Sequence, residues 1–228
     1  MLRVALTGGM GSGKTAAAAI FRELGCFVSQ SDEVARFMMQ PGEPVYNSIV
    51  HAFGPAVVTP DQSLDRRTLA QLAFADGRIE ELNSIVHPAV IAHQSAWMRS
   101  VAEQDAHPIA MVESALIFET KHGAVGTPNA PEAPWRTRFD RIVLITAPED
   151  LRIDRYVRRV GASTTAERSA AQADARARLQ AQMPDAEKAA LSDCVIRNDS
   201  SLDALRSAIK PVYERLRQES ADRAEESM

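Results

Sequence analysis

The sequence predicts an α/β fold in which helices flank a five-stranded parallel sheet. Five short apolar runs alternate with segments of helix-forming composition, and they cover residues 2–7, 26–29, 108–113, 139–146 and 194–196. The fourth run is almost continuously apolar, which is typical of a parallel strand that is buried on both faces. A glycine-rich stretch comes directly after the first run, and ligands of open α/β sheets bind at the carboxyl ends of the strands.

The composition is that of a globular protein with a substantial core. The chain has 228 residues, of which 45% are hydrophobic, and a net charge of −4. With a pI near 5.8, this charge argues against a nucleic-acid-binding or membrane-binding surface. Cys26 and Cys194 are far apart and show no metal-type spacing, which indicates reduced thiols. We expect a cytoplasmic monomer or weak homo-oligomer without a signal peptide or a membrane span.

The stretch between the first strand and the first helix has the pattern of a phosphate-binding loop. Residues 8–15 read GGMGSGKT and fit G-x-x-x-x-G-K-[ST], with a strand before them and a helix after them. We expect the nucleoside triphosphate to contact Gly9, Met10, Gly11, Ser12, Gly13, Lys14 and Thr15. Lys14 would reach the β- and γ-phosphates, and the hydroxyl of Thr15 would bind Mg²⁺. The alternative is a glycine-rich turn that matches by chance, and the flanking strand and helix argue against it.

A carboxylate comes after the second predicted strand. Asp32 lies at the carboxyl end of that strand, on the edge of the sheet that carries the phosphate loop. It is therefore a candidate general base, or a group that orients a hydroxyl acceptor. The alternative is that Asp32 is the N-cap of a helix over residues 33–39, and the two roles are compatible.

The region from residue 33 to residue 104 has a helical pattern. We expect helices over residues 45–53, 65–73 with Asp65 as N-cap, 78–86 and 89–102, the last two separated by His87-Pro88. A helical insertion after the second strand is where many kinases with such a loop hold the phosphoryl acceptor. His87 has no second member of a catalytic pair nearby in the sequence, which favours a helix-boundary or packing residue over a catalyst.

Two further predictions concern the third strand and the segment after it. Glu113 ends that strand, where an acid can hold Mg²⁺ or its water shell, although many buried strands end in a polar residue. Residues 121–138 are rich in glycine and proline and predict a surface loop. At the other end of the chain, we expect an amphipathic helix over residues 202–217 and a frayed charged tail over residues 219–228.

Arginines recur at helical spacing after the fourth strand. Arg152, Arg155 and Arg159 stand at i, i+3 and i+7 and therefore share one helix face. Such a row is suited to bidentate phosphate contacts, whereas the alternative is a solvated basic face paired with Asp150 and Asp154. A capping-box pattern, Thr164-x-x-Glu167, begins the next helix. We interpret the helix pair as a closing lid that excludes water from the reaction.

These elements predict three parts of the chain. The nucleotide-binding core comprises residues 1–32, 105–150 and 189–228. The helical acceptor-binding region comprises residues 33–104, and the lid comprises residues 151–188.

Short motifs follow one another along the chain in a specific order and spacing. They are ALTGGMGSGKT at 5–15, Asp32 with Val34-Ala35-Arg36, Gln40-Pro41-Gly42, Phe53-Gly54-Pro55, Leu64-Asp65-Arg66, His87-Pro88, Leu116-Ile117-Phe118-Glu119, Arg155, Arg158-Arg159, Ala181-Gln182-Met183, Lys188 and Ile196-Arg197-Asn198. Together these motifs resemble the dephospho-CoA kinase family, which belongs to the P-loop kinases, and the resemblance covers residues 2–216.

The resemblance implies an enzyme that uses ATP and Mg²⁺ to phosphorylate the ribose 3′-hydroxyl of dephospho-CoA. It assigns catalysis to Asp32, Lys14 and Arg155. It adds Arg159 and Asn198 to the ATP-binding residues. The acceptor-binding residues that it implies are Thr7, Asp32, Arg36, His87 and Leu116.

The chain also departs from the family pattern at three positions. Gln30 replaces the first of two acids, Arg152 stands where the family commonly has glutamine, and Val160 stands where an aspartate is usual. One alternative function is that of a nucleoside monophosphate kinase or another small-molecule kinase with the same architecture. A GTPase switch is the other alternative, but residues 145–148, ITAP, do not resemble the Asn-Lys-x-Asp segment that reads guanine.

Overall fold

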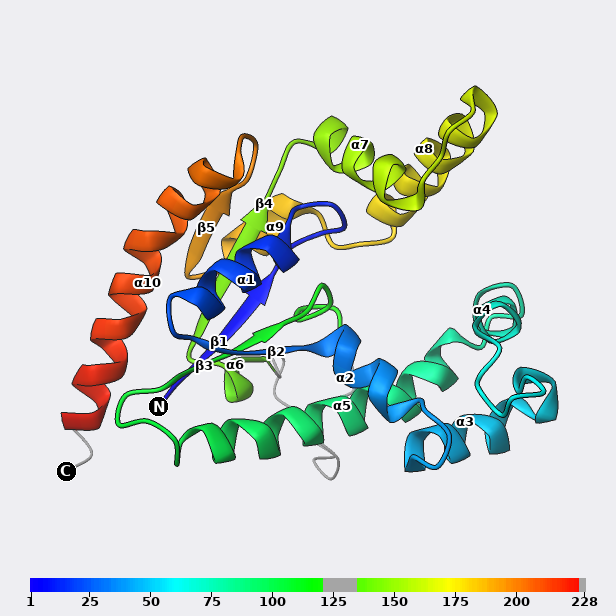
Figure 1. Cartoon of the computed structure of the whole chain (residues 1–228), viewed down its shortest axis with the longest axis horizontal. Coiled ribbons are helices and arrows are strands. Elements are labelled where there is room, and N and C mark those ends of the chain that lie inside the picture. Colours follow the sequence, from blue (N-terminus) through cyan, green and yellow to red (C-terminus); the bar gives the residue numbers. More distant parts are fainter. Residues whose placement is uncertain (121–134, 226–228) are drawn as a thin grey trace. The chain divides into compact units, whose positions relative to one another are not determined.

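A computed structural model describes residues 1–120 and 135–225 of the chain (Figure 1). Its five strands form one parallel sheet in the order β2-β3-β1-β4-β5, which confirms the predicted fold class. The strands are β1 (Leu2–Thr7), β2 (Phe27–Gln30), β3 (Ile109–Glu113), β4 (Arg141–Thr146) and β5 (Cys194–Arg197). Each lies within two residues of its predicted position. None of the helices in the described part has the length and hydropathy of a bilayer-spanning segment.

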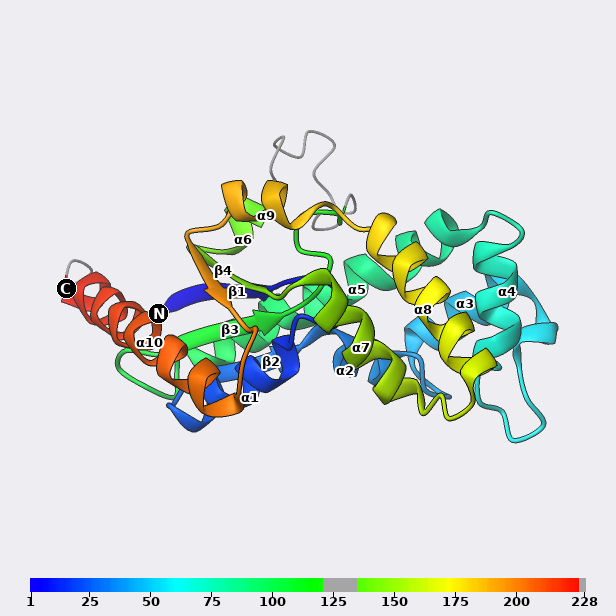
Figure 2. The ribbon, with the colours of Figure 1, turned by 90° about the horizontal axis from the view of Figure 1, so that it is seen from above.

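Helices cover both faces of the sheet. Figure 2 shows α1 (Lys14–Glu23) and α10 (Leu202–Glu225) on one face and α9 (Asp185–Leu191) on the other. Alternate residues of β1, including Leu2 and Leu6, face α1 and α10, because side chains alternate along a strand. They pack with Phe21 of α1 and Ile209 of α10 into the main hydrophobic core. This packing fixes the carboxyl end of β1, from which the phosphate loop extends.

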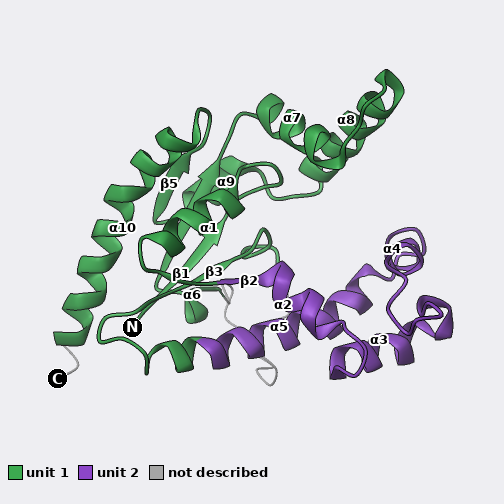
Figure 3. Ribbon diagram, in the orientation of Figure 1, with its two compact units in different colours: residues 1–28, 98–119, 135–228 green, residues 29–97, 120–134 purple. Residues whose placement is uncertain are grey.

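The chain divides into two compact units (Figure 3). Within the described residues, unit 1 comprises 1–28, 98–119 and 135–225, and unit 2 comprises 29–97 and 120. Unit 1 contains most of the sheet, and unit 2 is mainly helical. The division into core, acceptor region and lid stays a prediction.

Unit 2 is built around its own hydrophobic core. Its helical elements are α2 (Ser31–Met38), α3 (Pro44–Phe53), the 3₁₀ turn η1 (Pro55–Val57), α4 (Arg66–Phe74) and most of α5 (Ile79–Val101). Ile49 and Val57 are fully buried in this core and pack with Leu69 of α4. Asp65 is the N-cap of α4, as predicted: its carboxylate accepts hydrogen bonds from the backbone N–H groups of Arg67 and Thr68, at 3.0 and 3.1 Å.

The predicted helix break at His87-Pro88 is wrong. Helix α5 runs without interruption from Ile79 to Val101, with Pro88 inside it. A proline in a helix interior removes a hydrogen bond and its ring crowds the preceding turn. Leu82, Ile85 and Ala89 on this helix pack against the core of unit 2. Burial of this apolar face offsets the cost of the proline.

Two predicted irregular segments are partly helical. Most of the predicted loop over residues 121–138 lies outside the described residues, but Trp135–Arg138 forms the short helix α6. The prediction of a frayed tail over residues 219–228 is wrong for residues 219–225, because α10 continues to Glu225, and residues 226–228 lie outside the described part of the chain. Charges that indicated a solvated tail make tertiary contacts instead: Glu219 pairs with Arg141 at 2.8 Å, and Arg223 pairs with Asp140 at 2.9 Å.

The two helices after β4 form a pair. Helices α7 (Glu149–Val160) and α8 (Thr165–Gln180) lie side by side in Figure 1 and share a small core of Ile153, Tyr156, Val157 and Ala175. The capping box that begins α8 is confirmed, since Thr164 accepts from the N–H of Glu167 and the Glu167 carboxylate accepts from the N–H of Thr164.

Candidate active site

Residues 8–13 connect β1 to the N-terminus of α1 and form a tightly enclosed loop. Gly11 and Gly13 have φ values of +73° and +94°, which favour glycine. A Cβ on Gly11 would lie 2.5 Å from the carbonyl oxygen of Arg152, and a Cβ on Gly13 would lie 2.1 Å from Nδ2 of Asn198. Both positions therefore require glycine, because the backbone has a positive φ and a side chain would clash with Arg152 or Asn198.

Side chains from α7 and from the end of β5 hold the loop carbonyl groups. Nε of Arg152 donates to the carbonyl of Met10 at 2.8 Å, and Nη1 of Arg155 donates to the carbonyl of Gly11 at 3.2 Å. Nδ2 of Asn198 donates to the carbonyl of Ser12 at 2.8 Å. In a trans peptide the N–H of the next residue points the opposite way. The N–H of Gly11 is thus turned away from Arg152, and the N–H of Gly13 is turned away from Asn198, which leaves both free to face a phosphate.

A cavity with a volume of 340 Å³ adjoins this loop. It is lined by Lys14 and Thr15 at the N-terminus of α1 and by Arg155, Tyr156 and Arg159 of α7, together with two loop glycines. Three of these side chains are cationic, and the helix N-terminus adds the positive end of its dipole. Nζ of Lys14 donates to the carbonyl of Gly9 at 3.2 Å. The cavity is suited to an anionic ligand such as a polyphosphate.

Two hydroxyl groups are buried at the base of the loop. Thr7 ends β1 and Ser12 lies in the loop, and both residues are fully buried. Within the described residues, neither hydroxyl has a hydrogen-bond partner. Buried hydroxyl groups without partners are costly, so a bound ligand or water at this position would stabilise them.

The oxygen ligands available for Mg²⁺ are few and suit that ion. Thr15 lines the cavity, and Glu113 is 8% exposed at the end of β3, which pairs with β1 through Leu6. The described residues contain no group of three or more His, Cys, Asp or Glu side chains that could hold a metal. Mg²⁺ in kinase sites needs no such cage, because phosphates and waters complete its coordination. The residues present therefore fit Mg²⁺ bound together with a nucleotide.

Asp32 and Arg36 belong to unit 2 and line a pocket there. This pocket has a volume of 680 Å³ and a largely apolar wall, with Arg66, Leu69 and Phe74 among its other lining residues. The interpretation of Asp32 as an N-cap is wrong, because α2 begins at Ser31 and Gln30 is its N-cap. Asp32 lies instead in the first turn of α2, where the helix dipole favours a carboxylate.

The two remaining residues that the resemblance implied for acceptor binding lie in different units. His87 is half-buried inside α5 of unit 2, so the helix-boundary interpretation is wrong. Leu116 lies in unit 1 after β3 and is 38% exposed, and its N–H donates to the Ser114 hydroxyl at 3.2 Å. Their roles in binding stay predictions.

The contacts of residues 182–188 could not be read from the sequence. Oε1 of Gln182 accepts from the N–H of Met10 at 3.0 Å, and Oδ2 of Asp185 pairs with Nη1 of Arg152 at 3.0 Å. Lys188 is fully buried and pairs with Glu119 at 2.8 Å. The resemblance included Gln182, Lys188 and Glu119 as motif positions, but no local pattern gave their partners. The sequence also predicted that Arg152 shares a solvent-exposed or phosphate-binding face with Arg155 and Arg159. Arg152 is instead 8% exposed and contacts the loop backbone.

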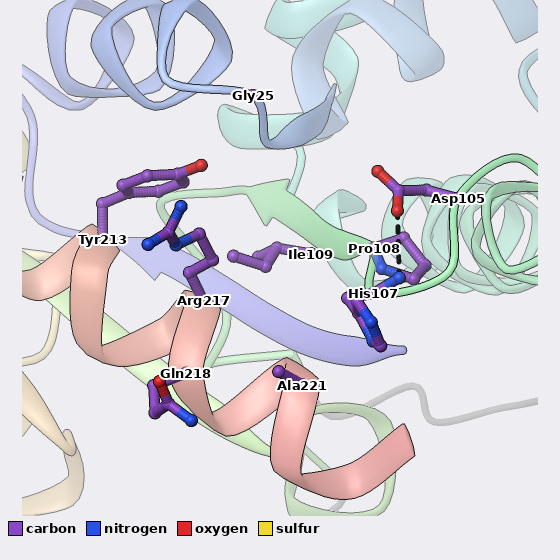
Figure 4. Close-up of a pocket in the computed structure, with 9 residues that line it drawn as sticks. All are labelled: Gly25, Asp105, His107, Pro108, Ile109, Tyr213, Arg217, Gln218 and Ala221. Atoms are coloured by element: carbon purple, nitrogen blue, oxygen red, sulfur yellow. Dashed lines mark hydrogen bonds between the residues drawn. The ribbon is translucent and has the colours of Figure 1, made fainter. Parts of the chain in front are cut away.

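A third pocket lies beside the amino end of β3. Figure 4 shows Tyr213 and Arg217 of α10 on one side of this pocket and Asp105 and His107, in the segment before β3, on the other. The Asp105 carboxylate accepts from the backbone N–H of His107 at 2.9 Å. Among its described lining residues, this pocket has neither a glycine-rich loop nor a helix N-terminus, which are the elements that bind phosphate in such folds.

The strand order, the glycine-rich loop and the cationic cavity together define a P-loop kinase. A family model described as dephospho-CoA kinase matches residues 2–204. The chain belongs to the dephospho-CoA kinase family.

Individual relatives agree with this assignment. The chain is 32% identical to a dephospho-CoA kinase of Moorella thermoacetica, over 97% of this chain and 95% of that protein. A crystal structure from Thermus thermophilus is 29% identical, covers 94% of this chain and 97% of its own, and superposes with a TM-score of 0.70. A dephospho-CoA kinase structure from Campylobacter jejuni is 20% identical, with a TM-score of 0.63 and coverage of 95% and 97%, and supports the fold.

Proposed function

We propose that this chain transfers the γ-phosphoryl group of ATP to the ribose 3′-hydroxyl of dephospho-CoA, which gives CoA and ADP. The proposal rests on the complete phosphate-binding loop at residues 8–15 of a chain that matches the dephospho-CoA kinase family over residues 2–204. This reaction would be the last step of coenzyme A synthesis.

The loop would bind the phosphates of ATP. Backbone N–H groups between Gly9 and Lys14 would surround the β-phosphate, and the N-terminus of α1 would add its dipole. The Lys14 ammonium would stabilise negative charge that develops between the β- and γ-phosphates. Its contact with the Gly9 carbonyl would then be exchanged for phosphate oxygens.

Mg²⁺ would bind beside Thr15, with Glu113 as a further ligand or as a partner of its water shell. When bound, it would neutralise phosphate charge. This assignment is supported by the hydroxyl of Thr15 in the cavity and by the carboxylate at the end of β3.

Arg155 and Arg159 of α7 would complete the phosphate site. Both line the cavity beside the loop, and Arg155 also donates to Gly11 and to the carbonyl of Asn198 at 3.1 Å. Arg155 would stabilise charge on the transferring group, and Arg159 would bind the nucleotide phosphates. Asn198 would hold the Ser12 carbonyl away from the nucleotide. Residues 151–188 would act as the lid.

The acceptor would contact residues of unit 2. Dephospho-CoA carries a pyrophosphate, and the pocket beside Asp32 offers the guanidinium groups of Arg36 and Arg66 together with apolar side chains. We propose that Asp32 accepts the proton of the 3′-hydroxyl or orients that group, and that Arg36 and His87 bind the acceptor. Thr7 and Leu116 would provide further acceptor contacts. Because the transition state of phosphoryl transfer is loose, alignment by Asp32 would matter as much as its basicity.

The partners would be the two small-molecule substrates alone. We propose that the protein acts in the cytoplasm, as a monomer or weak homo-oligomer, without binding nucleic acid or membranes.

The direct test incubates the purified protein with MgATP and dephospho-CoA and monitors ADP and CoA by mass-resolved chromatography. We expect the two products in equal amounts. Lys14→Ala and Asp32→Ala should each reduce turnover by a factor of about 100 or more, because each removes a group that acts on the reacting atoms.

AMP, CMP and shikimate serve as rival acceptors in parallel. Turnover on one of them without CoA formation would refute the proposed acceptor. Near-normal turnover by Asp32→Ala would refute the role of that residue. Glu33→Ala, an exposed carboxylate next to Asp32 in the same helix turn, is the matched control and should keep its activity.

A further inference from the structure

Arg152 connects the lid helix α7 to the phosphate loop. It is one of the few charged residues in the described structure that are less than a tenth exposed, at 8%. Its neighbours in the predicted arginine row, Arg155 and Arg159, line the cavity, whereas Arg152 does not. A buried guanidinium requires partners that compensate its charge and its lost hydration.

These contacts are with the loop backbone. Nε of Arg152 donates to the Met10 carbonyl at 2.8 Å. A Cβ on Gly9 would lie 1.8 Å from Nη2 of Arg152, so the guanidinium lies directly against the Cα of that glycine. The carbonyl of Arg152 also lies close to Gly11, where a Cβ would be 2.5 Å away. Arg152 thus covers the first half of the loop.

Two side chains after α8 complete this contact. Oδ2 of Asp185 lies 3.0 Å from Nη1 of Arg152 and fixes the orientation of the guanidinium. Oε1 of Gln182 accepts from the N–H of Met10 at 3.0 Å. Both backbone polar groups of Met10 are therefore held by side chains from residues 152–185.

We infer that Arg152, oriented by Asp185, is a positioning residue for the phosphate site. By holding the Met10 carbonyl against its own guanidinium, Arg152 turns the N–H of Gly11, in the same peptide, away from itself. This orientation prepares an N–H donor for a phosphate oxygen before the nucleotide binds. A reversed peptide would present a carbonyl oxygen to the phosphate and would repel it. The inference rests on the proposed function, because it assumes that the loop binds the phosphates of ATP.

These contacts also explain why an arginine at position 152 can hold the loop more firmly than a glutamine could. A glutamine amide can donate to the Met10 carbonyl but cannot form an ion pair with Asp185. Arg152 does both, since its Nε and Nη1 point in different directions of a rigid planar group. The chain therefore holds its loop with a side chain that is fixed at two points.

The test measures the affinity for MgADP by titration calorimetry, which needs no acceptor. Arg152→Met removes the donor and keeps an apolar stem, and we expect MgADP to bind about tenfold more weakly, as for loss of a charge-assisted hydrogen bond. Arg152→Gln should recover most of the affinity, because its amide can again donate to Met10. Arg158→Met is the matched control: this side chain is on the same helix, 75% exposed, and pairs with Asp154 alone among the described residues. It should bind MgADP as the wild type does.

Kinetics separate positioning from a general loss of structure. In Arg152→Met we expect the KM for ATP to rise by about the same factor, with the KM for dephospho-CoA unchanged. Asp185→Asn should produce a smaller rise and little further loss when combined with Arg152→Met, because the two residues act as one unit. Thermal unfolding without nucleotide verifies that each variant folds.

Three results would overturn the inference. They are unchanged MgADP affinity in Arg152→Met, the same loss in Arg158→Met, or an equal rise in both KM values. Normal MgADP binding by the wild type without CoA formation would instead refute the proposed acceptor and leave the role of Arg152 standing. If Arg152→Met does not fold, Arg152→Gln and Asp185→Asn provide the same comparison.

Discussion

A single buried lysine joins three segments of unit 1. Lys188 is fully buried, and its Nζ lies 2.8 Å from Oε1 of Glu119 and donates to the Ala115 carbonyl at 3.3 Å. The same carboxylate oxygen accepts from the N–H of Met183 at 3.2 Å. A buried ammonium is tolerated because this carboxylate and a carbonyl compensate its charge. The pair thus holds the segment after β3 against the segment that returns from α8.

Removal of the Glu119 charge should therefore destabilise the folded protein. We expect Glu119→Gln to lower the free energy of unfolding by about 3 kcal/mol, because it leaves a buried ammonium without its counter-charge. Urea denaturation at pH 7 measures this loss. The double variant Lys188→Met with Glu119→Met should lie within about 1 kcal/mol of the wild type, because it buries no uncompensated charge.

An exposed ion pair provides the control for this prediction. Asp154→Asn breaks a pair with Arg158 whose side chains are 40% and 75% exposed, and we expect a change of no more than about 0.5 kcal/mol. A loss in Glu119→Gln as small as this would show that Lys188 needs no carboxylate partner.

At the level of residues, the sequence predicted those features that depend on near neighbours. The phosphate loop, the Asp65 N-cap and the capping box of α8 are short patterns with a local physical cause. The contact between Gln182 and Met10 joins positions 172 apart, and nothing near either residue indicates it. The buried position of Arg152 was missed for the same reason, because helical spacing gives the face of a residue but not the segment that covers that face.

At the level of elements, one aspartate connects two strands and the last helix. Asp140 directly precedes β4, and its carboxylate accepts from the backbone N–H of Arg3 in β1 at 2.8 Å and pairs with the Arg3 guanidinium. Arg223 of α10 approaches the same carboxylate at 2.9 Å. Burial alone would raise the pKa of Asp140, but the hydrogen bonds from Arg3 and Arg223 outweigh it and hold this pKa at about 2.

This pKa predicts a loss of stability in acid. The carboxyl group has an ordinary pKa of 3.8 in the unfolded chain and a lower one in the folded chain. Its contribution is therefore fully present above about pH 4 and is lost as the pH falls toward 2, and we expect it to be about 1–2 kcal/mol after solvent screening. Urea denaturation of the wild type and of Asp140→Asn from pH 7 to pH 2 tests this. The difference in free energy of unfolding between the wild type and Asp140→Asn should shrink toward zero as the pH falls from about 4 to 2.

The control is an aspartate in an exposed pair. Asp199→Asn breaks a contact with Arg197 in which the two side chains are 40% and 71% exposed, so its effect should be small at every pH. A difference between wild type and Asp140→Asn that stays constant down to pH 2 would contradict the assignment.

Elements were predicted where local propensity and tertiary packing agree. Every strand was found because its apolar run is bounded by polar or turn residues. The interior of α5 was missed because Pro88 argues for a break, and only the packing of Leu82 and Ile85 into the core of unit 2 keeps the helix continuous. The end of α10 was missed because Glu219 and Arg223 suggest solvent, whereas both pair with groups at β4.

At the scale of the whole molecule, two stretches of regular structure run across the boundary between the units. Helix α5 passes from residue 97 of unit 2 to residue 98 of unit 1 without a break, and β2 passes from residue 28 to residue 29. Unfolding of either unit would remove hydrogen bonds of an element that the other also uses. We therefore expect one cooperative transition for the whole chain.

The two tryptophans allow this expectation to be tested with a ligand. Trp97 belongs to unit 2, and Trp135 belongs to unit 1, where it packs edge-on against Phe118 with ring centroids 5.3 Å apart. Trp97→Phe and Trp135→Phe each leave one fluorescent reporter, so that each unit is observed by itself. The nucleotide would bind to unit 1, which carries the phosphate loop.

MgADP at 100 times its dissociation constant should raise the free energy of unfolding by about 2.7 kcal/mol, because it binds the folded state. If the units unfold together, the Trp97 signal must shift in urea by as much as the Trp135 signal, although unit 2 contributes none of the loop residues. Lys14→Ala, introduced into both reporters, should abolish the two shifts. A Trp97 transition that stays in place while the Trp135 transition moves would show that α5 and β2 do not couple the units, and that unit 2 unfolds independently.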